Sequence, residues 1–196
     1  MTHLKSRPMR LVFIPALLLF TGLLLGCDRG PAPPDPSAAG PVQEIDWDAL
    51  IPAEWQPETL LDDYDLDEIG DEDPRAVEVM EKLKTLWAEA PVVQALDGQR
   101  VRLPGFVVPL DLEPGKIAEF LLVPYYGACI HVPPPPANQT IFVRMPEGQP
   151  LEGEMFDTVW VEGTMSVTPT TSDLAEAGYR IEATRVEPYE GDVEPM

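Results

Sequence analysis

The sequence predicts a mainly β protein with one α-helix, and three observations support this fold class. Residues 92–190 contain short runs rich in Val, Ile, Phe and Trp, separated by Gly, Pro and Asp, which is the pattern of β-strands. Residues 74–90 carry apolar side chains at helical spacing. About 170 residues remain after an N-terminal leader, which is enough for one domain with a real core.

Residues 1–26 are typical of a secretory signal peptide. Three basic residues precede an apolar run that ends in Leu-Leu-Gly-Cys at Cys27. The run is too short for a membrane span, which needs about 20 residues. Its ending resembles the bacterial lipobox, in which the peptide is cut before an acylated cysteine. We therefore expect a lipid at Cys27 that anchors the protein on the periplasmic side of a membrane, with the inner membrane favoured by Asp28.

Residues 27–42 are rich in Pro, Gly and Ala, and we expect a disordered tether here. Without residues 1–26 the chain has ten basic and thirty-four acidic residues, a net charge of −24. The negative charge argues against nucleic-acid binding, which needs Lys and Arg at the phosphates. It also argues against electrostatic binding to anionic lipid.

Residues 43–91 are predicted to form an acidic, tryptophan-containing segment followed by a helix packed on the β domain. Trp47 and Trp55 are expected to pack on the domain. Asp73-Pro74 has the pattern of an N-cap followed by proline at the first helical position, and Pro91 ends the helix. The apolar stripe expected to enter the core consists of Ala76, Met80, Leu83 and Trp87.

Residues 92–190 are predicted to form the β domain, and residues 191–196 a tail. Asp97-Gly98 predicts a hairpin between strands 92–96 and 99–103, and Gly105 can kink the second strand. Residues 172–177 are expected to form a short helix with Ser172 as its N-cap. These elements suit a small, partly open barrel of the OB type, although a β-sandwich fits the spacing almost as well. Further strands are expected at 106–110, 120–123, 140–144, 158–161 and 179–183.

The segment most suited to chemistry surrounds Cys129 and His131. If residues 127–132 are extended, the two side chains lie on one face, about 6.5 Å apart at Cβ. Ala128, Ile130 and Val132 then face the core. Four prolines, Pro133, Pro134, Pro135 and Pro136, follow as a stiff wall, and Asn138 and Gln139 would return polar groups toward the site.

Three roles remain open for the pair. Cys129 and His131 are a buried structural pair, or two ligands of a metal, or a thiol nucleophile with its base. Structural zinc takes four ligands, so a zinc site needs carboxylates or a second copy of the chain. Because Cys27 is committed to lipid, Cys129 has no partner for an intramolecular disulfide.

At these residues the chain resembles a family of bacterial lipoproteins of unknown function, DUF3299. The resemblance rests on YYGACIHVPPPPANQ at 125–139, with GFVVPLD upstream, VWVEGTMSV downstream and IDWDALI at 45–51. It implies an OB-like barrel and an association with ABC-type transport components and zinc-responsive settings. The signature residues that it marks are Tyr125, Tyr126, Gly127, Cys129, His131 and Pro133 to Pro136.

Together these features predict a non-enzymatic periplasmic lipoprotein. In this interpretation Cys129 and His131 bind a metal ion, for which the ligand types favour zinc, and the protein is an accessory or chaperone of envelope transport. The first alternative is a metal-free module that docks on an ABC-type transporter through the tyrosines and prolines. The second alternative is a thiol enzyme. The sequence leaves the oligomeric state open.

Overall fold

The computed structural model describes residues 40–56, 59, 73–110, 116–131 and 133–191. Several predictions concern residues outside this part of the chain. They are those for the signal peptide, Cys27, most of the tether, most of the acidic run and nearly all of the tail. Its helices and strands are β1 Gln43–Glu44, the 3₁₀ turn η2 Asp48–Leu50, α1 Pro74–Ala88, the 3₁₀ turn η5 Gln94–Leu96, β2 Arg100–Pro109, β3 Glu119–Val123, the 3₁₀ turn η6 Ala137–Gln139, β4 Ile141–Arg144, β5 Thr158–Ser166, β6 Thr170–Thr171, β7 Glu176–Ala177 and β8 Tyr179–Pro188.

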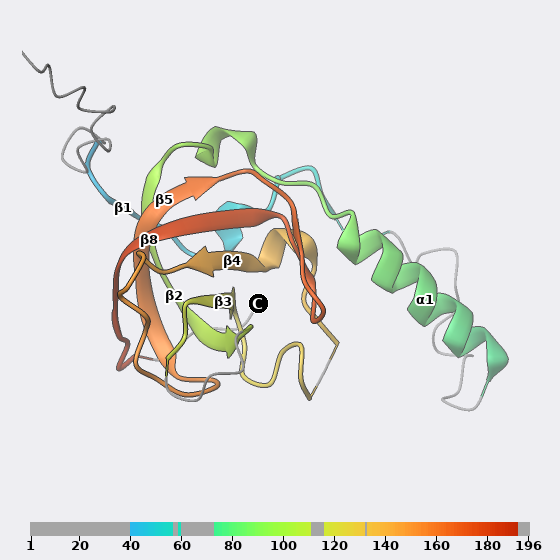
Figure 1. Cartoon of the computed structure of the whole chain (residues 1–196). Coiled ribbons are helices and arrows are strands. Elements are labelled where there is room, and N and C mark those ends of the chain that lie inside the picture. The colour runs from blue at the N-terminus through green and yellow to red at the C-terminus, as the bar shows by residue number, and fades with distance from the viewer. Residues whose placement is uncertain (1–39, 57–58, 60–72, 111–115, 132, 192–196) are drawn as a thin grey trace, which may run out of the picture. The chain divides into compact units, whose positions relative to one another are not determined.

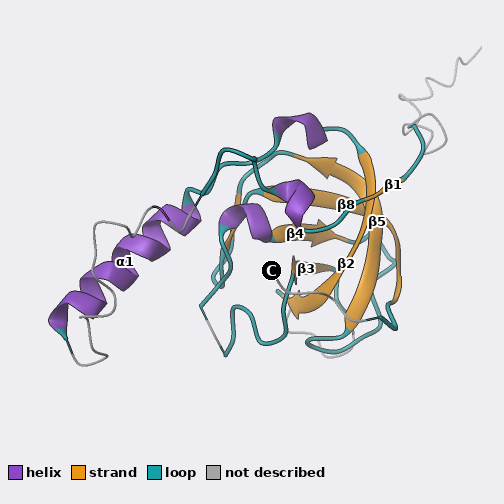
Figure 2. Ribbon diagram, turned by 180° about the vertical axis from the view of Figure 1, so that it is seen from behind, coloured by secondary structure: helices purple, strands orange, loops and turns teal. Residues whose placement is uncertain are grey.

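Within the described residues, five strands close into a small barrel in the order β2-β3-β4-β8-β5, with β5 returning to β2. Figures 1 and 2 show the strands wrapping around a common centre. The β4–β8 pair is parallel, and the other neighbours in the barrel are antiparallel. This arrangement confirms the predicted OB-like barrel and excludes the β-sandwich alternative.

The long strand β2 closes the barrel because it pairs with two partners. Its first part pairs with β5 from Arg100 to Phe106, and its last part pairs with β3 from Phe106 to Pro109. Gly105 lies where the strand changes partner. A Cβ atom there would lie 2.7 Å from Leu122 Cγ and 2.9 Å from the Trp47 ring, so the glycine allows this close approach.

The interior of the barrel is the main apolar cluster, and the N-terminal segment belongs to it. Trp47 is buried, and its indole N–H donates to the Pro104 carbonyl at 2.8 Å. The prediction that Trp47 packs on the domain is confirmed, and Trp55 is half-buried. The largest buried members of the cluster are Tyr179, Phe120, Leu50, Leu103, Leu122, Ile141, Met165 and Ile181.

The predicted hairpin around Asp97-Gly98 is wrong. Residues 94–96 form η5, and the Gly98 N–H donates to the Met165 carbonyl at 2.8 Å. The Asp97 carboxylate accepts the Val167 N–H at 3.0 Å. The turn is therefore held against β5, and β5 rather than residues 92–96 pairs with the beginning of β2.

The predicted helix at 172–177 is also wrong, because this stretch forms the tip of the β6–β7 hairpin. The Ser172 hydroxyl accepts the N–H groups of Leu174 and Ala175 and donates to the Ala175 carbonyl at 2.8 Å. A serine that caps a helix can equally close a tight turn on its own backbone.

The predicted helix at 74–90 is present as α1 Pro74–Ala88, and the Asp73 carboxylate accepts the Arg75 N–H at 2.9 Å. Its apolar stripe does not join the barrel core: Met80 is 42% exposed, and Ala76, Leu83 and Trp87 are partly exposed. Neither apolar cluster contains them. The stripe therefore does not enter the core as predicted, and the helix meets barrel residues through its last turn, where Lys84, Trp87 and Ala88 line a groove.

Candidate functional site

The Cys-x-His segment is a tight turn, so the extended backbone on which the same-face placement of Cys129 and His131 depended is absent. The His131 N–H donates to the Gly127 carbonyl at 2.8 Å, and the Ile130 N–H donates to the same oxygen at 3.3 Å. Gly127 has φ +85° and Cys129 has φ +66°, both in the left-handed region. The same-face argument for Cys129 and His131 therefore does not apply, because it holds only for extended chain.

Cys129 is half-buried against a second apolar cluster on the outside of the barrel. Burial raises the pKa of its thiol from 9.0 to about 11. The thiol is protonated at neutral pH, whereas the thiolate is the form that attacks an electrophile. Buried members of this cluster are Val108, Leu121, Val123, Ala128, Phe142, Ala175 and Ala177.

His131 is exposed, with its ring 5.9 Å from that of Phe156. Among the residues that the structure describes, no group of three His, Cys, Asp or Glu side chains is placed to hold a metal ion. Zinc sites use at least three protein ligands. The zinc prediction at Cys129 and His131 thus stays a prediction that requires ligands from elsewhere.

The two tyrosines of the motif have different environments. Tyr125 is half-buried, its hydroxyl donates to the Pro133 carbonyl at 3.5 Å, and burial, followed by the nearby Cys129, raises its pKa. Tyr126 is 67% exposed. Ala128 faces the core as predicted, but Ile130 is 40% exposed because the turn directs it outward. Val132 lies outside the described residues.

Tyr126 is the centre of a cluster of rings that we call the aromatic surface. Its ring lies 4.7 Å from Phe156 and 6.1 Å, edge to face, from Phe106. Phe156 has φ +67°, and its N–H donates to the Val107 carbonyl at 2.7 Å. The aromatic surface consists of Phe106, Tyr126, His131 and Phe156 with the exposed neighbours Ile130 and Met155.

Only two described non-glycine residues have positive φ: Phe156, which belongs to the aromatic surface, and Cys129, which lies in the turn that carries Tyr126 and His131. Such backbone conformations are costly and concentrate at functional sites. Sequence reasoning missed Phe106, Met155 and Phe156, because no local signal links them to the motif. Phe106 lies beside the motif because β2 pairs with β3, where Phe106 is opposite Val123. Met155 and Phe156 lie there because the loop before β5 folds back onto β2.

Asn138 and Gln139 do not return polar groups to the site, contrary to the prediction. Both are fully buried in η6. The Asn138 amide donates to the Pro91 carbonyl at 2.9 Å, and the Gln139 amide donates to the Trp47 carbonyl at 2.9 Å. These two hydrogen bonds fix the N-terminal segments on the barrel. The Trp47 carbonyl also accepts the Leu50 N–H at 3.2 Å.

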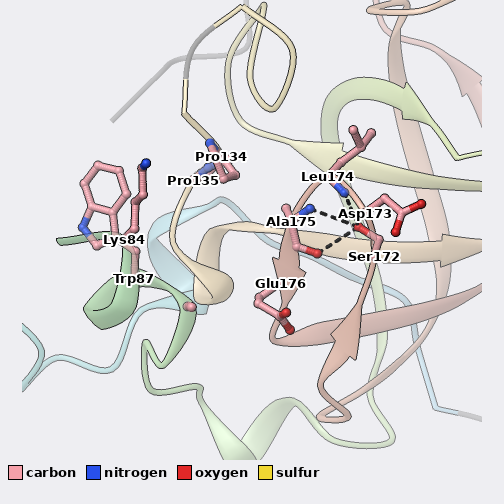
Figure 3. A pocket seen from close by; sticks show the side chains of 10 residues that line it. Lys84, Trp87, Pro134, Pro135, Ser172, Asp173, Leu174, Ala175 and Glu176 are labelled. Carbon is pink, nitrogen blue, oxygen red and sulfur yellow. Dashed lines mark hydrogen bonds between the residues drawn. The ribbon is translucent and has the colours of Figure 1, made fainter. Parts of the chain in front are cut away.

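The four prolines at 133–136 differ in burial. Pro133 is exposed, Pro134 and Pro136 are half-buried, and Pro135 is buried. Pro134 and Pro135 line a groove of about 250 Å³, which we call the proline groove (Figure 3). Its other lining residues are Lys84, Trp87 and Ala88 of α1 and Ser172 to Glu176 of the β6–β7 hairpin.

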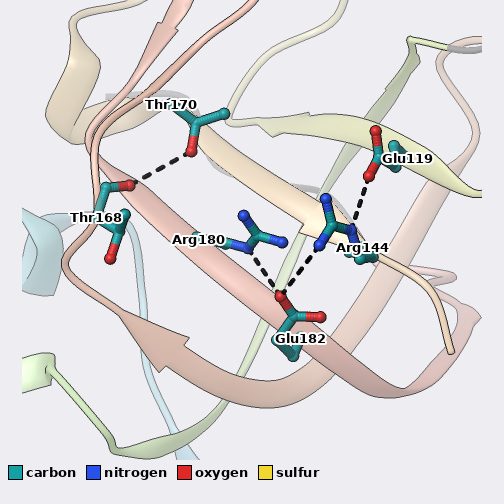
Figure 4. A network of polar contacts seen from close by, with 6 residues as sticks. All are labelled: Glu119, Arg144, Thr168, Thr170, Arg180 and Glu182. Carbon is teal, nitrogen blue, oxygen red and sulfur yellow. Dashed lines mark hydrogen bonds and ion pairs between the residues drawn. The ribbon is translucent and has the colours of Figure 1, made fainter.

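The basic side chains on the barrel face formed by β3, β4 and β8 are engaged by carboxylates. Arg144 contacts Glu119 at 2.7 Å and Glu182 at 4.0 Å, and Arg180 contacts Glu182 at 2.8 Å (Figure 4). Arginines already paired in this way are poor ligands for a polyanion. Arg144 and Arg180 are therefore already neutralised by acidic neighbours on this face.

Comparisons with known proteins agree with these observations. The family model described as a protein of unknown function, DUF3299, matches residues 47–188. The chain is similar to the crystal structure of a DUF3299 family protein from Pseudomonas aeruginosa PAO1, with 41% identity over 78% of this chain and 99% of that chain and a TM-score of 0.60.

An OBody bound to hen egg-white lysozyme matches 48% of this chain and 84% of its own at 17% identity, but the TM-score of 0.30 supports no inference. No curated protein matches the sequence. In the part of the chain that the structure describes, no helix has the length and apolarity needed to cross a bilayer. The family match and the Pseudomonas structure together show that the chain belongs to the DUF3299 family of proteins of unknown function.

Proposed function

We propose that this chain is a lipid-anchored docking protein of the bacterial envelope. In this proposal a lipid at Cys27 and a proline-rich tether hold the barrel near the periplasmic face of a membrane. The aromatic surface contacts a membrane protein, and an ABC-type transport component is the class of partner that the family resemblance implies. The observation that carries the proposal is Tyr126, a large ring that is 67% exposed in a fixed turn.

The aromatic surface has the properties of a binding anchor. Exposed tyrosines with few rotatable bonds provide contact area at a low entropic cost, and Tyr is enriched among residues that dominate binding energy. The backbone hydrogen bonds at Gly127 and Phe156 fix both loops before any partner binds. A surface that is ordered in advance loses less conformational entropy on association.

The pair Cys129 and His131 supports binding better than catalysis. A half-buried thiol with a pKa of about 11 is protonated at neutral pH, whereas reactive cysteines lie in surroundings that lower the thiol pKa. In the docking interpretation Cys129 packs the turn onto the outer apolar cluster, so that Tyr126 and Ile130 are presented to solvent.

Site-specific photo-crosslinking in cells tests the proposal. A photoreactive residue at position 130 should yield a cross-linked product with one integral membrane protein, and the same residue at the exposed position 147 should not. Tyr126→Ser should remove most of the product, while Tyr126→Phe should keep it because the ring remains. Equal yields from positions 130 and 147, or a product insensitive to Tyr126→Ser, contradict docking at the aromatic surface.

A second candidate function is zinc binding, and the strained backbone of Cys129 favours it. Left-handed non-glycine residues persist where the surroundings require them, as ligand sites do. The two side chains supply half of a four-ligand set. Two copies of the chain, each contributing Cys129 and His131, would complete a Cys₂His₂ site.

Elemental analysis combined with a molar-mass measurement tests this second candidate. The zinc-binding candidate requires about one zinc per two chains and a dimer at neutral pH. Cys129→Ser and His131→Ala should each remove the metal, while neutral substitutions in the acidic run at 62–73 should not. Because both ligands must be deprotonated, the metal should dissociate as the pH falls below about 6. A metal-free monomer contradicts the candidate.

A further inference from the structure

We propose that the proline groove binds a cationic side chain, arginine or lysine, from an extended segment of the protein partner. The inference rests on the proposed docking function and names the chemistry of the partner at a second contact. The groove and the aromatic surface are joined by one stretch of chain, because residues 126–131 carry exposed rings and Pro134 and Pro135 line the groove.

The apolar wall of the groove suits the stem and the planar head of such a side chain. Trp87 lies opposite Pro134 and Pro135 in Figure 3, with Leu174 on the hairpin side. The indole face of tryptophan attracts cations more strongly than any other side-chain ring. Prolines lack N–H donors and present a rigid apolar surface.

The polar rim of the groove is acidic. Asp173 is exposed, and Glu176 accepts a hydrogen bond from the Thr171 hydroxyl at 2.8 Å while remaining partly exposed. The cation of the lining, Lys84, is paired with Glu81 on its own helix at 2.9 Å. The net charge of the lining side chains is therefore negative, and the groove is complementary to a positive group.

The shape of the acidic wall is fixed before binding. The Ser172 hydroxyl bonds three backbone groups of the hairpin tip, as the dashed lines in Figure 3 show. The backbone of Asp173 is therefore held beside the groove by a closed turn, and its exposed side chain extends from there. A site with this degree of order discriminates well between a charged group and its neutral isostere.

The size of the groove indicates one side chain of a longer segment. Its volume of about 250 Å³ lies below the roughly 300–1,000 Å³ of pockets that enclose whole small molecules. A free metabolite would be only partly covered. A segment that crosses the groove can place one arginine or lysine between Trp87 and the carboxylates.

Indole NMR of the full chain in a nonionic detergent tests the inference, because the sequence contains four tryptophans and ¹⁵N-tryptophan labelling gives one indole signal for each. The probes are three acetylated, amidated pentapeptides with two alanines on each side of arginine, lysine or citrulline. The arginine and lysine peptides should shift the Trp87 signal in a saturable manner. The citrulline peptide should not, because citrulline keeps the shape of arginine without its charge.

The control variants preserve the shape of the groove. Asp173→Asn combined with Glu176→Gln should weaken binding of the arginine peptide at least tenfold, while Glu147→Gln, outside the lining, should leave it unchanged. Unshifted Trp47 and Trp160 signals show that the fold is intact.

Equal shifts from arginine and citrulline, or loss of binding with Glu147→Gln, overturn the inference. So does tighter binding of choline chloride than of the arginine peptide, which indicates a lipid headgroup. Because these shifts are measured on the isolated chain and cross-linking at position 130 is measured in cells, the two proposals fail separately.

Discussion

The thiol of Cys129 packs against the outer apolar cluster in a turn whose backbone is left-handed. Burial raises the pKa of this thiol to about 11, and this gives a direct test of its environment. At pH 8 we expect the native chain to react with a disulfide reagent at least tenfold more slowly at Cys129 than the urea-unfolded chain does, because reaction requires the thiolate. Cys129→Ser provides the background rate, and equal native and unfolded rates would show an open thiol.

The same shift affects stability at high pH. The folded state holds the thiol proton more tightly than the unfolded state, so the unfolded chain ionises first as the pH rises. The stabilising contribution is complete below the ordinary value of 9.0 and is lost as the pH rises towards about 11. The effect is modest because Cys129 is only partly buried.

Tyr179 joins three parts of the chain through one buried hydroxyl. It accepts the Val93 N–H at 2.6 Å and donates to the Leu50 carbonyl at 2.7 Å. Tyr179→Phe leaves both backbone groups without this partner, and we expect a loss of about 1–3 kcal/mol in the free energy of unfolding. Tyr126→Phe, at an exposed ring, should change it by less than about 0.5 kcal/mol. Urea unfolding of both variants decides whether the hydroxyl fixes these segments.

At the scale of the elements, local patterns predicted most of the strands. Residues 120–123, 140–144, 158–161 and 179–183 lie within or overlap β3, β4, β5 and β8, because apolar, β-branched runs between turn residues carry their signal locally. The hairpin at 92–96 could not be excluded from sequence. Its Asp-Gly signal is local, whereas the bond from Gly98 to Met165 that determines the turn is not.

The candidate site was less predictable than the barrel for the same reason. The segment 125–139 was recognisable as unusual, and Tyr126 is exposed at its centre. Its backbone could not be assigned, since a left-handed Cys129 is an exception to residue preference. Phe106 is brought to Tyr126 by the pairing of β2 with β3 and Phe156 by the pairing of β2 with β5, and neither contact is local in sequence.

The helix α1 should contribute little to the stability of the barrel. Leu83 is partly exposed and belongs to neither apolar cluster, whereas Leu122 is fully buried in the barrel. We expect Leu83→Ala to reduce the free energy of unfolding by less than about 1 kcal/mol and Leu122→Ala to reduce it by about 2–5 kcal/mol. Urea unfolding measures both. A loss at Leu83 as large as that at Leu122 would show that the helix packs as part of the core.

At the scale of the whole molecule, the acidic charge limits the ways in which the proposed membrane attachment can arise. The chain without residues 1–26 has ten basic and thirty-four acidic residues. On the barrel, several of the basic residues are paired with carboxylates, as Arg100 is with Glu162 at 2.8 Å. An anionic lipid surface repels such a molecule. If the chain is attached to a membrane as proposed, the attachment has to come from a lipid or from a partner protein.

These two sources of attachment are distinguished by Cys27→Ser. If a lipid at Cys27 is the anchor, the wild type should incorporate labelled palmitate and remain in the membrane fraction in about 1 M salt, because buried acyl chains contribute about 0.8 kcal/mol per methylene and do not depend on ionic strength. Cys27→Ser should carry no label. Its processing should also stop, because cleavage requires the acylated cysteine, and it should accumulate at the precursor mass. A processed, unlabelled wild type that salt removes from membranes would instead assign attachment to the partner protein, with Tyr126→Ser then releasing it.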